Sequence, residues 1–186
     1  MKRKIICMIF LFLIISSKSY ATTNTDIDFN GSLEDGVGSL GVWISPSCEY
    51  TYSIPQAIDN WNYPGWSNPV NMISVEESQY SYIDFYQVYR PGANYTAYTI
   101  CYSAQNEGLT YYQKEYMDWR YAEITLNEAV MGSRPTYKNI GTIIHEMGHA
   151  MGLKDINRRS SIMHFNSDKI YYRVTRDAND AIVRKY

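Results

Sequence analysis

The sequence predicts one α/β (α+β) domain organised around one helical segment. Five segments have the alternation or composition typical of strands, and three have the apolar periodicity of helices. One of these helical segments contains the motif His-Glu-x-x-His. A chain of 186 residues is long enough for one domain with a sizeable core, and its composition does not suggest two.

The first part of the expected domain alternates strand patterns with one helix. Four segments have strand character: 37–44, 70–75, 82–89 and 96–102. Residues 53–61 predict a helix, with Ser53 as a candidate cap and Pro55 in the first turn. The mixed polarity of 96–102 suits a strand at the edge of a sheet.

The second part contains the remaining strand and two helices. Residues 104–119 show no clear period and are expected to form a loop, whereas 122–127 alternate as a strand that half faces a core. The helix that contains the His-Glu-x-x-His motif follows, with an apolar stripe made of Ile140, Ile143, Ile144, Met147 and Met151. Residues 175–186 predict a closing helix with acidic residues first and basic residues last, as the helix dipole favours.

The N-terminus has the pattern of a secretory signal. Residues 2–4 are basic, 5–15 are apolar, and small residues precede an expected cleavage site after Ala21. Eleven apolar residues are too few to span a bilayer. Residues 22–36 are polar and acidic, and we expect a flexible leader, or a short pro-segment in which Asp26 or Asp28 caps the metal. The catalytic domain would then comprise residues 37–186.

Charge and aromatic content narrow the expected partners. Removing residues 1–21 takes away four of the 17 Lys and Arg and none of the 19 Asp and Glu, which leaves a net charge of −6. Nucleic acid is therefore not an expected partner. The 19 tyrosines are more consistent with half-buried strand surface than with a binding cleft for sugars or bases.

Two cysteines remain after the expected cleavage, because Cys7 leaves with the signal. In an exported protein the economical interpretation is a disulfide between Cys48 and Cys101. The alternative is two buried free thiols.

The segment from His145 to Asp155 predicts a zinc site. His145 and His149 are four residues apart, so on a helix their imidazoles share one face and can hold one cation. Glu146 would lie beside the ligands, where a general base can take a proton from metal-bound water. Gly152 can adopt the positive φ that ends a helix, which lets Asp155 return as the third ligand. The fourth position would remain for water.

This segment, followed by Ser161-Ile162-Met163-His164, resembles the metzincin zinc endopeptidases. Their pattern is HExxHxxGxx[H/D], followed by a turn that places a methionine beneath the metal. The spacing of eight residues from Asp155 to Met163 is most similar to that of the matrixins. The resemblance extends over residues 37–186 and is strong only from residue 122 onward.

The resemblance implies a zincin fold and a proteolytic function. The expected fold is a twisted, mostly parallel five-stranded sheet with an antiparallel edge strand, a zinc helix and a C-terminal helix. The expected function is a secreted, monomeric zinc endopeptidase with Glu146 as general base, acting on protein or peptide substrates and free of the membrane after signal cleavage.

The chain departs from the matrixin pattern in several ways. Asp155 stands where matrixins have His, as in snapalysin-like bacterial proteases. Matrixins bind a second, structural zinc through further His residues, but the only other His here is His164, so one catalytic zinc is expected. No acidic loop of the EF-hand type is present, which leaves calcium binding open. Phe165 lacks the hydroxyl of the tyrosine that supports catalysis in the similar astacin turn.

Two further site assignments concern His164 and Gly141. His164 is the rival third ligand, although a turn that presents Met163 to the metal would point its neighbour elsewhere. Gly141 lies four residues before His145, where matrixins place a residue that sets the depth of a specificity pocket. A glycine there suggests a roomy pocket for large apolar residues.

Two other functions are compatible with the same residues. One is a zinc amidase that acts on cell-wall peptide, and the other is a secreted binding protein or toxin component that uses the cleft for recognition. The intact Glu146 and both His favour an enzyme.

Overall fold

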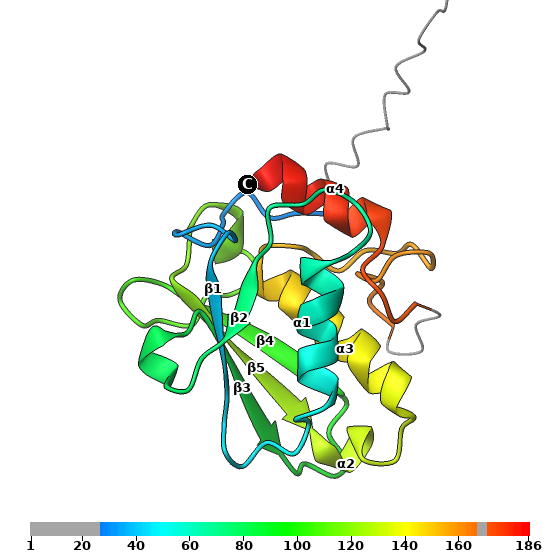
Figure 1. Ribbon diagram of the computed structural model, residues 1–186. Helices are drawn as coiled ribbons and strands as arrows, with labels where there is room; N and C mark the ends of the chain where they lie inside the picture. Colours follow the sequence, from blue (N-terminus) through cyan, green and yellow to red (C-terminus); the bar gives the residue numbers. More distant parts are fainter. Residues whose placement is uncertain (1–26, 167–170) are drawn as a thin grey trace, which may run out of the picture.

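The computed structural model describes residues 27–166 and 171–186, which form a five-stranded sheet packed against helices (Figure 1). The strand order is β2-β1-β3-β5-β4, in which β4 pairs antiparallel with β5 and all other pairs are parallel. The predicted α/β class and mostly parallel sheet with an antiparallel edge strand are thus confirmed. Within the described ranges, none of the helices combines the length and hydrophobicity that a bilayer crossing requires.

The elements follow the predicted order; four strands are shorter than predicted, and β5 is one residue longer. The strands are β1 (Leu40–Ile44), β2 (Met72–Ser74), β3 (Ile83–Val88), β4 (Ala97–Tyr102) and β5 (Tyr121–Asn127). The α-helices are α1 (Ser53–Asn62), α2 (Glu128–Met131), α3 (Thr136–Ala150) and α4 (Arg176–Lys185), and two 3-10 turns are η1 (Ser78–Tyr80) and η2 (Gln113–Glu115). The short helix α2 was not predicted. Ser53 is the first residue of α1 and makes no capping hydrogen bond, because Tyr52 occupies the cap position.

The core lies between the sheet and the helices α1 and α3, which cover the same face of the sheet (Figure 1). Ile83, Phe85 and Ile124 from the central strands are fully buried there. Two buried indoles tie other elements to α3. The indole N–H of Trp61 in α1 donates to the carbonyl of Ile144 at 3.0 Å, and that of Trp119 donates to Ala150 at 2.8 Å. These contacts fix the position of α3 from its middle to its C-terminal end.

The opposite face of the sheet carries half-buried aromatic residues. Tyr102 and Tyr121, partners in the β4–β5 ladder, stack with ring centroids 4.7 Å apart. Trp43 and Tyr86 meet edge to face at 5.7 Å. Several tyrosines therefore serve as strand surface. Others, such as Tyr63 and Tyr112, are largely exposed.

Residues 27–36 are not a loose leader, which corrects part of the expectation for 22–36. Ile27, Phe29 and Leu33 are each at most 2% exposed. The amide of Phe29 donates to the carbonyl of Gly152 at 2.9 Å, and the amide of Leu33 donates to the hydroxyl of Tyr186 at 2.9 Å. Three apolar side chains in a polar stretch are enough to anchor it against the end of α3. The expected signal and residues 22–26 lie outside the described residues.

The expected disulfide is absent, since Cys48 and Cys101 are both buried free cysteines. Cys48 lies near the carboxyl end of β5. The hydroxyl of Tyr50, two residues further on, donates to the carboxylate of Glu128, and this carboxylate also helps to raise the pKa of the Cys48 thiol. Cys101 pairs with Ala122, at the other end of β5. A strand rises about 16 Å between Ala122 and Asn127, which is too far for a disulfide.

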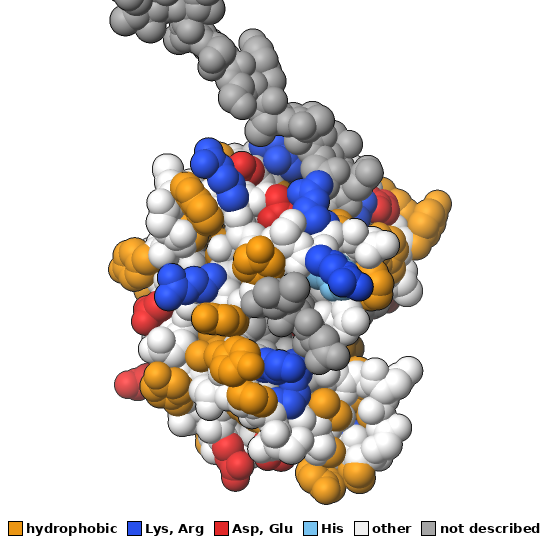
Figure 2. All heavy atoms as spheres, turned by 90° about the vertical axis from the view of Figure 1, so that its right-hand side faces the viewer, with side chains coloured by type: hydrophobic (Ala, Val, Ile, Leu, Met, Phe, Trp, Pro, Cys, Tyr) orange, Lys and Arg blue, Asp and Glu red, His pale blue; other side chains and the backbone are white. Residues whose placement is uncertain are grey.

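The side of the molecule that lies on the right in Figure 1 exposes both hydrophobic and charged side chains. Figure 2 shows this face, where hydrophobic side chains are interspersed with those of Lys and Arg. Exposed aromatic residues such as Tyr137 and Tyr172, which meet edge to face at 5.4 Å, are common on solvated surfaces.

Candidate metal centre

The end of α3 determines how the metal ligands meet. Gly152 has φ of +96°, a conformation that glycine adopts without strain. The amide of Leu153 donates to the carbonyl of Gly148 at 2.9 Å, and the amide of Gly152 donates to that of His149 at 3.1 Å. These two bonds form a Schellman motif, which satisfies the last helical carbonyls and reverses the chain. Asp155 is thereby carried back over the helix.

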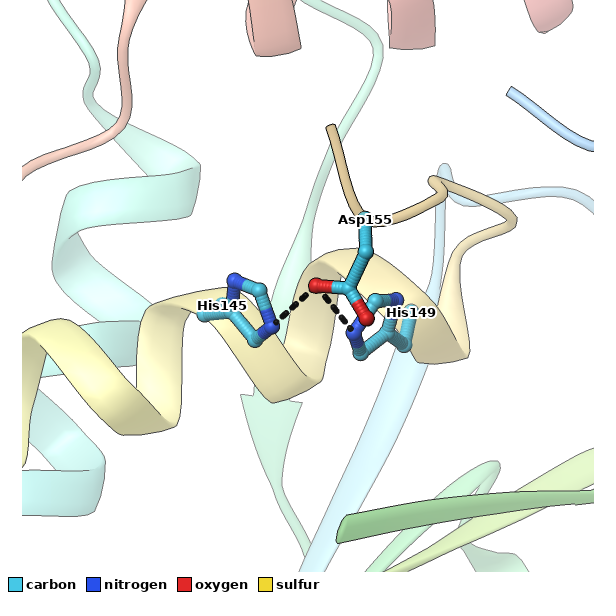
Figure 3. A group of neighbouring side chains, drawn as sticks. All are labelled: His145, His149 and Asp155. Carbon is cyan, nitrogen blue, oxygen red and sulfur yellow. Dashed lines mark ion pairs between the residues drawn. The ribbon is translucent and has the colours of Figure 1, made fainter. Parts of the chain in front are cut away.

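The structure brings the side chains of His145, His149 and Asp155 together (Figure 3). The two imidazoles lie one turn apart on α3, and the carboxylate reaches them from the loop after the helix. Asp155 Oδ1 is 3.2 Å from Nε2 of His145 and 3.6 Å from Nε2 of His149. The three ligand atoms lie within 4.8 Å of one another, and they form the only such group of His, Cys, Asp and Glu in the part of the chain that the structure describes.

Hydrogen bonds fix the tautomer of both imidazoles. Nδ1 of His145 lies 2.9 Å from the carbonyl oxygen of Ile162, and Nδ1 of His149 lies 2.8 Å from that of Leu153. A carbonyl oxygen only accepts, so each Nδ1 carries the proton and each Nε2 offers its lone pair toward Asp155. This is the protonation state that a metal ligand requires.

The spacing of the three atoms fits a tetrahedral ion. Ligands about 2.0–2.1 Å from zinc at tetrahedral angles are about 3.3 Å apart. The two distances from Asp155 Oδ1, 3.2 and 3.6 Å, bracket that value. Burial and the neighbouring imidazole of His145 also lower the pKa of His149 to about 4, which keeps its ring neutral at neutral pH. His145, His149 and Asp155 could therefore hold one metal ion.

Met163 packs against α3 at Gly148, between the two metal-binding histidines. A β-carbon built on Gly148 would be 2.6 Å from its sulfur and 3.1 Å from its terminal methyl group. Met163 is fully buried, and its carbonyl accepts the amide of Ile156, the residue after Asp155, at 2.9 Å. The methionine turn is thus joined both to the helix and to the segment that carries the third ligand.

Glu146 lies beside the ligands and is held by a residue that the sequence did not indicate. The hydroxyl of Thr99, on β4, is 2.7 Å from Oε2 of Glu146 and 3.1 Å from its backbone carbonyl. Glu146 is 6% exposed, and its side chain borders the same cleft as the metal ligands. The strand at the edge of the sheet therefore orients the carboxylate expected to act as base.

The ligands and Glu146 line an open cleft of about 590 Å³. Its other walls include Asn94, Tyr95, Tyr98, Phe29, Tyr111, Lys114, Thr142, Phe165 and Asn166. The amide of Asn127 donates to the carbonyl of Thr96 at 2.9 Å, so even-numbered residues of β4 bond to β5. Ala97 and Thr99 therefore direct their backbone groups to the outer edge of the sheet, along the cleft.

Gly141, expected to open a specificity pocket, is not among the described residues that line this cleft. A β-carbon there would lie 3.1 Å from the carbonyl oxygen of Tyr171 and 3.2 Å from the Cα of Tyr172. The backbone of the segment before α4 thus fills the space beside Gly141. Its neighbour Thr142 is the residue of that helical turn that lines the cleft.

His164 is not part of the metal group in the structure. Its ring stacks on Phe165 at 4.7 Å, and its Nδ1 accepts the amide of Asn166 at 3.1 Å. The parallel bridge between Ile156 and His164 holds this segment beside the one that carries Asp155. The geometry therefore favours Asp155 over His164 as third ligand.

Comparison with models of known protein families gives no match. Comparison with characterised proteins also gives none.

The sequence did not indicate Thr99, Phe29, Tyr111 or Lys114 as residues of the site. Phe29 was placed in the leader, and the other three lie in segments without a motif. Only the alternation of β4 offered a signal for Thr99, since Ala97, Thr99 and Cys101 share the face toward the core.

Proposed function

We propose that this protein is a secreted zinc endopeptidase of the metzincin type. The observation that carries the proposal is the convergence of His145, His149 and Asp155 beside the held carboxylate of Glu146, in a cleft bordered by a strand edge. The helix spacing, the turn at Gly152 and the buried Met163 are the features in which the chain resembles that clan.

The residues of the chain divide the reaction among them. A zinc ion at this position supplies a polarised water and stabilises developing negative charge. The substrate peptide pairs with the outer edge of β4 through the backbone groups of Ala97 and Thr99. Glu146 takes the proton of the attacking water and passes it to the leaving amine. Thr99 holds the Glu146 carboxylate toward the metal ligands while this proton moves.

The proposal is tested by metal analysis together with a protease assay. The purified protein should contain about one zinc per chain and degrade casein, and a chelator should abolish the activity. Glu146→Ala should keep the metal and lose at least about 100-fold in rate. Casein activity retained by Glu146→Ala would refute the mechanism. Activity on peptidoglycan but not on casein would favour a cell-wall amidase, and metal binding without hydrolysis would favour a binding protein.

A further inference from the structure

Lys114 is a charged residue of the cleft that the proposed reaction does not use. It belongs to η2 and is 8% exposed, yet it lines the cleft that contains the metal ligands. Phe29 and Tyr111, which meet edge to face at 4.9 Å, line the cleft beside it.

The Lys114 ammonium lies over an aromatic ring. Its Nζ is 4.5 Å from the centroid of the Phe29 ring. Among the described residues, no carboxylate lies within ion-pair distance of Lys114. A cation–π contact offsets only part of the cost of removing an ammonium from water.

The nearest acidic residue in sequence, Glu115, has a different partner. Its Oε1 is 2.5 Å from Nζ of Lys154, which also lies near the Phe29 ring, at 5.2 Å. The hydrogen bond from Lys154 is the main reason why the pKa of Glu115 lies below its usual value. Two ammonium groups thus flank the Phe29 ring, and Glu115 pairs with the one that does not line the cleft.

Lys114 also has a defined place along the cleft. The amide of Phe29 donates to Gly152, just beyond the C-terminal end of α3. Thr142 lies one turn before His145, on the other side of the metal ligands. Lys114 therefore lies at the end of the cleft that is nearest the C-terminus of α3, and Thr142 lies toward the opposite end.

We propose that Lys114 forms a subsite for a carboxylate of the bound peptide, so that the enzyme prefers acidic substrates. The inference rests on the proposed function, because it assigns a substrate class to the same cleft. The carboxylate belongs either to an Asp or Glu side chain or to the C-terminus of a short peptide. In both cases the peptide carboxylate accepts a charge-assisted hydrogen bond from the Lys114 ammonium, which has no carboxylate partner among the described residues.

The test uses the zinc-loaded protein and a family of fluorogenic peptides. Glu, Gln and Lys are placed in turn at each position around the scissile bond, and each peptide is made with a free and with an amidated C-terminus. The wild type should prefer Glu to Gln at one position, or a free to an amidated terminus, by about tenfold or more in kcat/KM. The preference should decrease as salt concentration rises.

Substitution of Lys114 links that preference to the residue. Lys114→Met should bring the Glu to Gln ratio close to one, and Lys114→Glu should favour the Lys peptide. Lys138→Met, which removes the same charge from α3 outside the cleft, should keep the wild-type ratio. Absence of any carboxylate preference in the wild type, or its persistence in Lys114→Met, overturns the proposal. If Lys114→Met does not fold, Lys114→Gln replaces it under the same criterion.

Binding separates this inference from the proposed function. If the wild type cleaves no peptide, the protease assignment fails, and fluorescence anisotropy of the labelled Glu and Gln peptides decides about the subsite. Tighter binding of the Glu peptide that is lost in Lys114→Met supports it. Equal binding of the two peptides to the wild type refutes it.

Discussion

The sulfur of Met163 lies 2.6 Å from the position that a β-carbon would occupy on Gly148. Gly148 is the residue of α3 just before His149, so Met163 packs against the backbone that carries both imidazoles. Because α3 is a regular helix at that point, its backbone conformation does not call for a glycine. The glycine instead makes room for the close approach of Met163. A side chain at this position would force the end of the Met163 side chain to move.

Gly148→Ala should therefore damage the centre through packing alone. The added methyl group must displace Met163, and overpacking of a filled core costs about 1–3 kcal/mol in the free energy of unfolding. Urea denaturation with and without zinc measures the loss. Gly38→Ala is the control, because its β-carbon would meet only the carbonyl oxygen of Pro69, at 3.9 Å. In the double variant Gly148→Ala/Met163→Ala the added methyl group no longer meets the Met163 side chain. If its loss of stability still equals the sum of the losses in the two single variants, the contact with Met163 is not what destabilises Gly148→Ala.

The third metal ligand gives the second prediction. Asp155→Ala should weaken zinc binding by at least about 100-fold, because second-shell changes alone cost 10–100-fold. His164→Ala should leave the affinity within a few-fold, since the ring of His164 stacks on Phe165. Zinc competition with a chromophoric chelator measures both affinities. The reverse pattern would move the third ligand to His164.

Local patterns made much of the fold and the metal group predictable. The spacing of His145 and His149 determines their relation on any α-helix, and the positive φ of Gly152 depends on its own neighbours. Strand alternation likewise reports which residues face a core. Each of these signals acts over a few residues, so the sequence alone is enough to read it.

The remaining features depend on contacts between distant segments. Thr99 and Glu146 are 47 positions apart and meet only because β4 lies at the sheet edge beside α3. Counting cysteines predicts a pair between Cys48 and Cys101. Strand register places Cys101 at one end of β5, and the loop that contains Cys48 lies at the other end, near Glu128. The burial of Ile27 and Phe29 depends on the chain reversal after α3. Sequence patterns do not encode such registers directly.

Thr99 provides the third prediction. Its hydroxyl is 2.7 Å from the carboxylate of Glu146, so Thr99→Val removes a donor while nearly preserving shape. A lost hydrogen bond to a charged group is worth about 1.5–3 kcal/mol, which corresponds to roughly a tenfold or greater decrease in kcat. Thr99→Ser keeps the hydroxyl and should restore most of the rate. Steady-state kinetics and zinc content should be measured together. A decrease in kcat that Thr99→Ser does not rescue would indicate a packing role.

The two cysteines provide the fourth prediction. Burial raises the pKa of the Cys101 thiol to about 12 and also raises that of Cys48, so neither should react readily with a thiol reagent in the folded protein. Unfolding protein that lacks residues 1–21 in guanidinium, without reductant, should expose two reactive thiols per chain. Titration with Ellman's reagent before and after unfolding measures this. Detection of no thiol after unfolding would show that the disulfide forms.

Asp84 provides a prediction about stability and pH. This residue of β3 is 7% exposed and is paired in register with Glu123 of β5. Burial raises its pKa above the usual 3.8, Glu123 adds to the rise, and a hydrogen bond from Ser81 opposes it. Folding therefore favours protonated Asp84, and its stabilising contribution is full below pH 3.8 and is lost as pH rises through the higher pKa of the folded state.

Asp84→Asn keeps an oxygen that can accept from Ser81 but never becomes charged. Its free energy of unfolding should exceed that of the wild type at pH 7, and the difference should disappear near pH 3. Urea denaturation between pH 3 and pH 8 measures both curves. Asp59→Asn, at an exposed position of α1, controls for the loss of one negative charge. If Asp84→Asn is instead less stable than the wild type at pH 7 and this loss shrinks near pH 3, the carboxylate is held by interactions that favour its charged form.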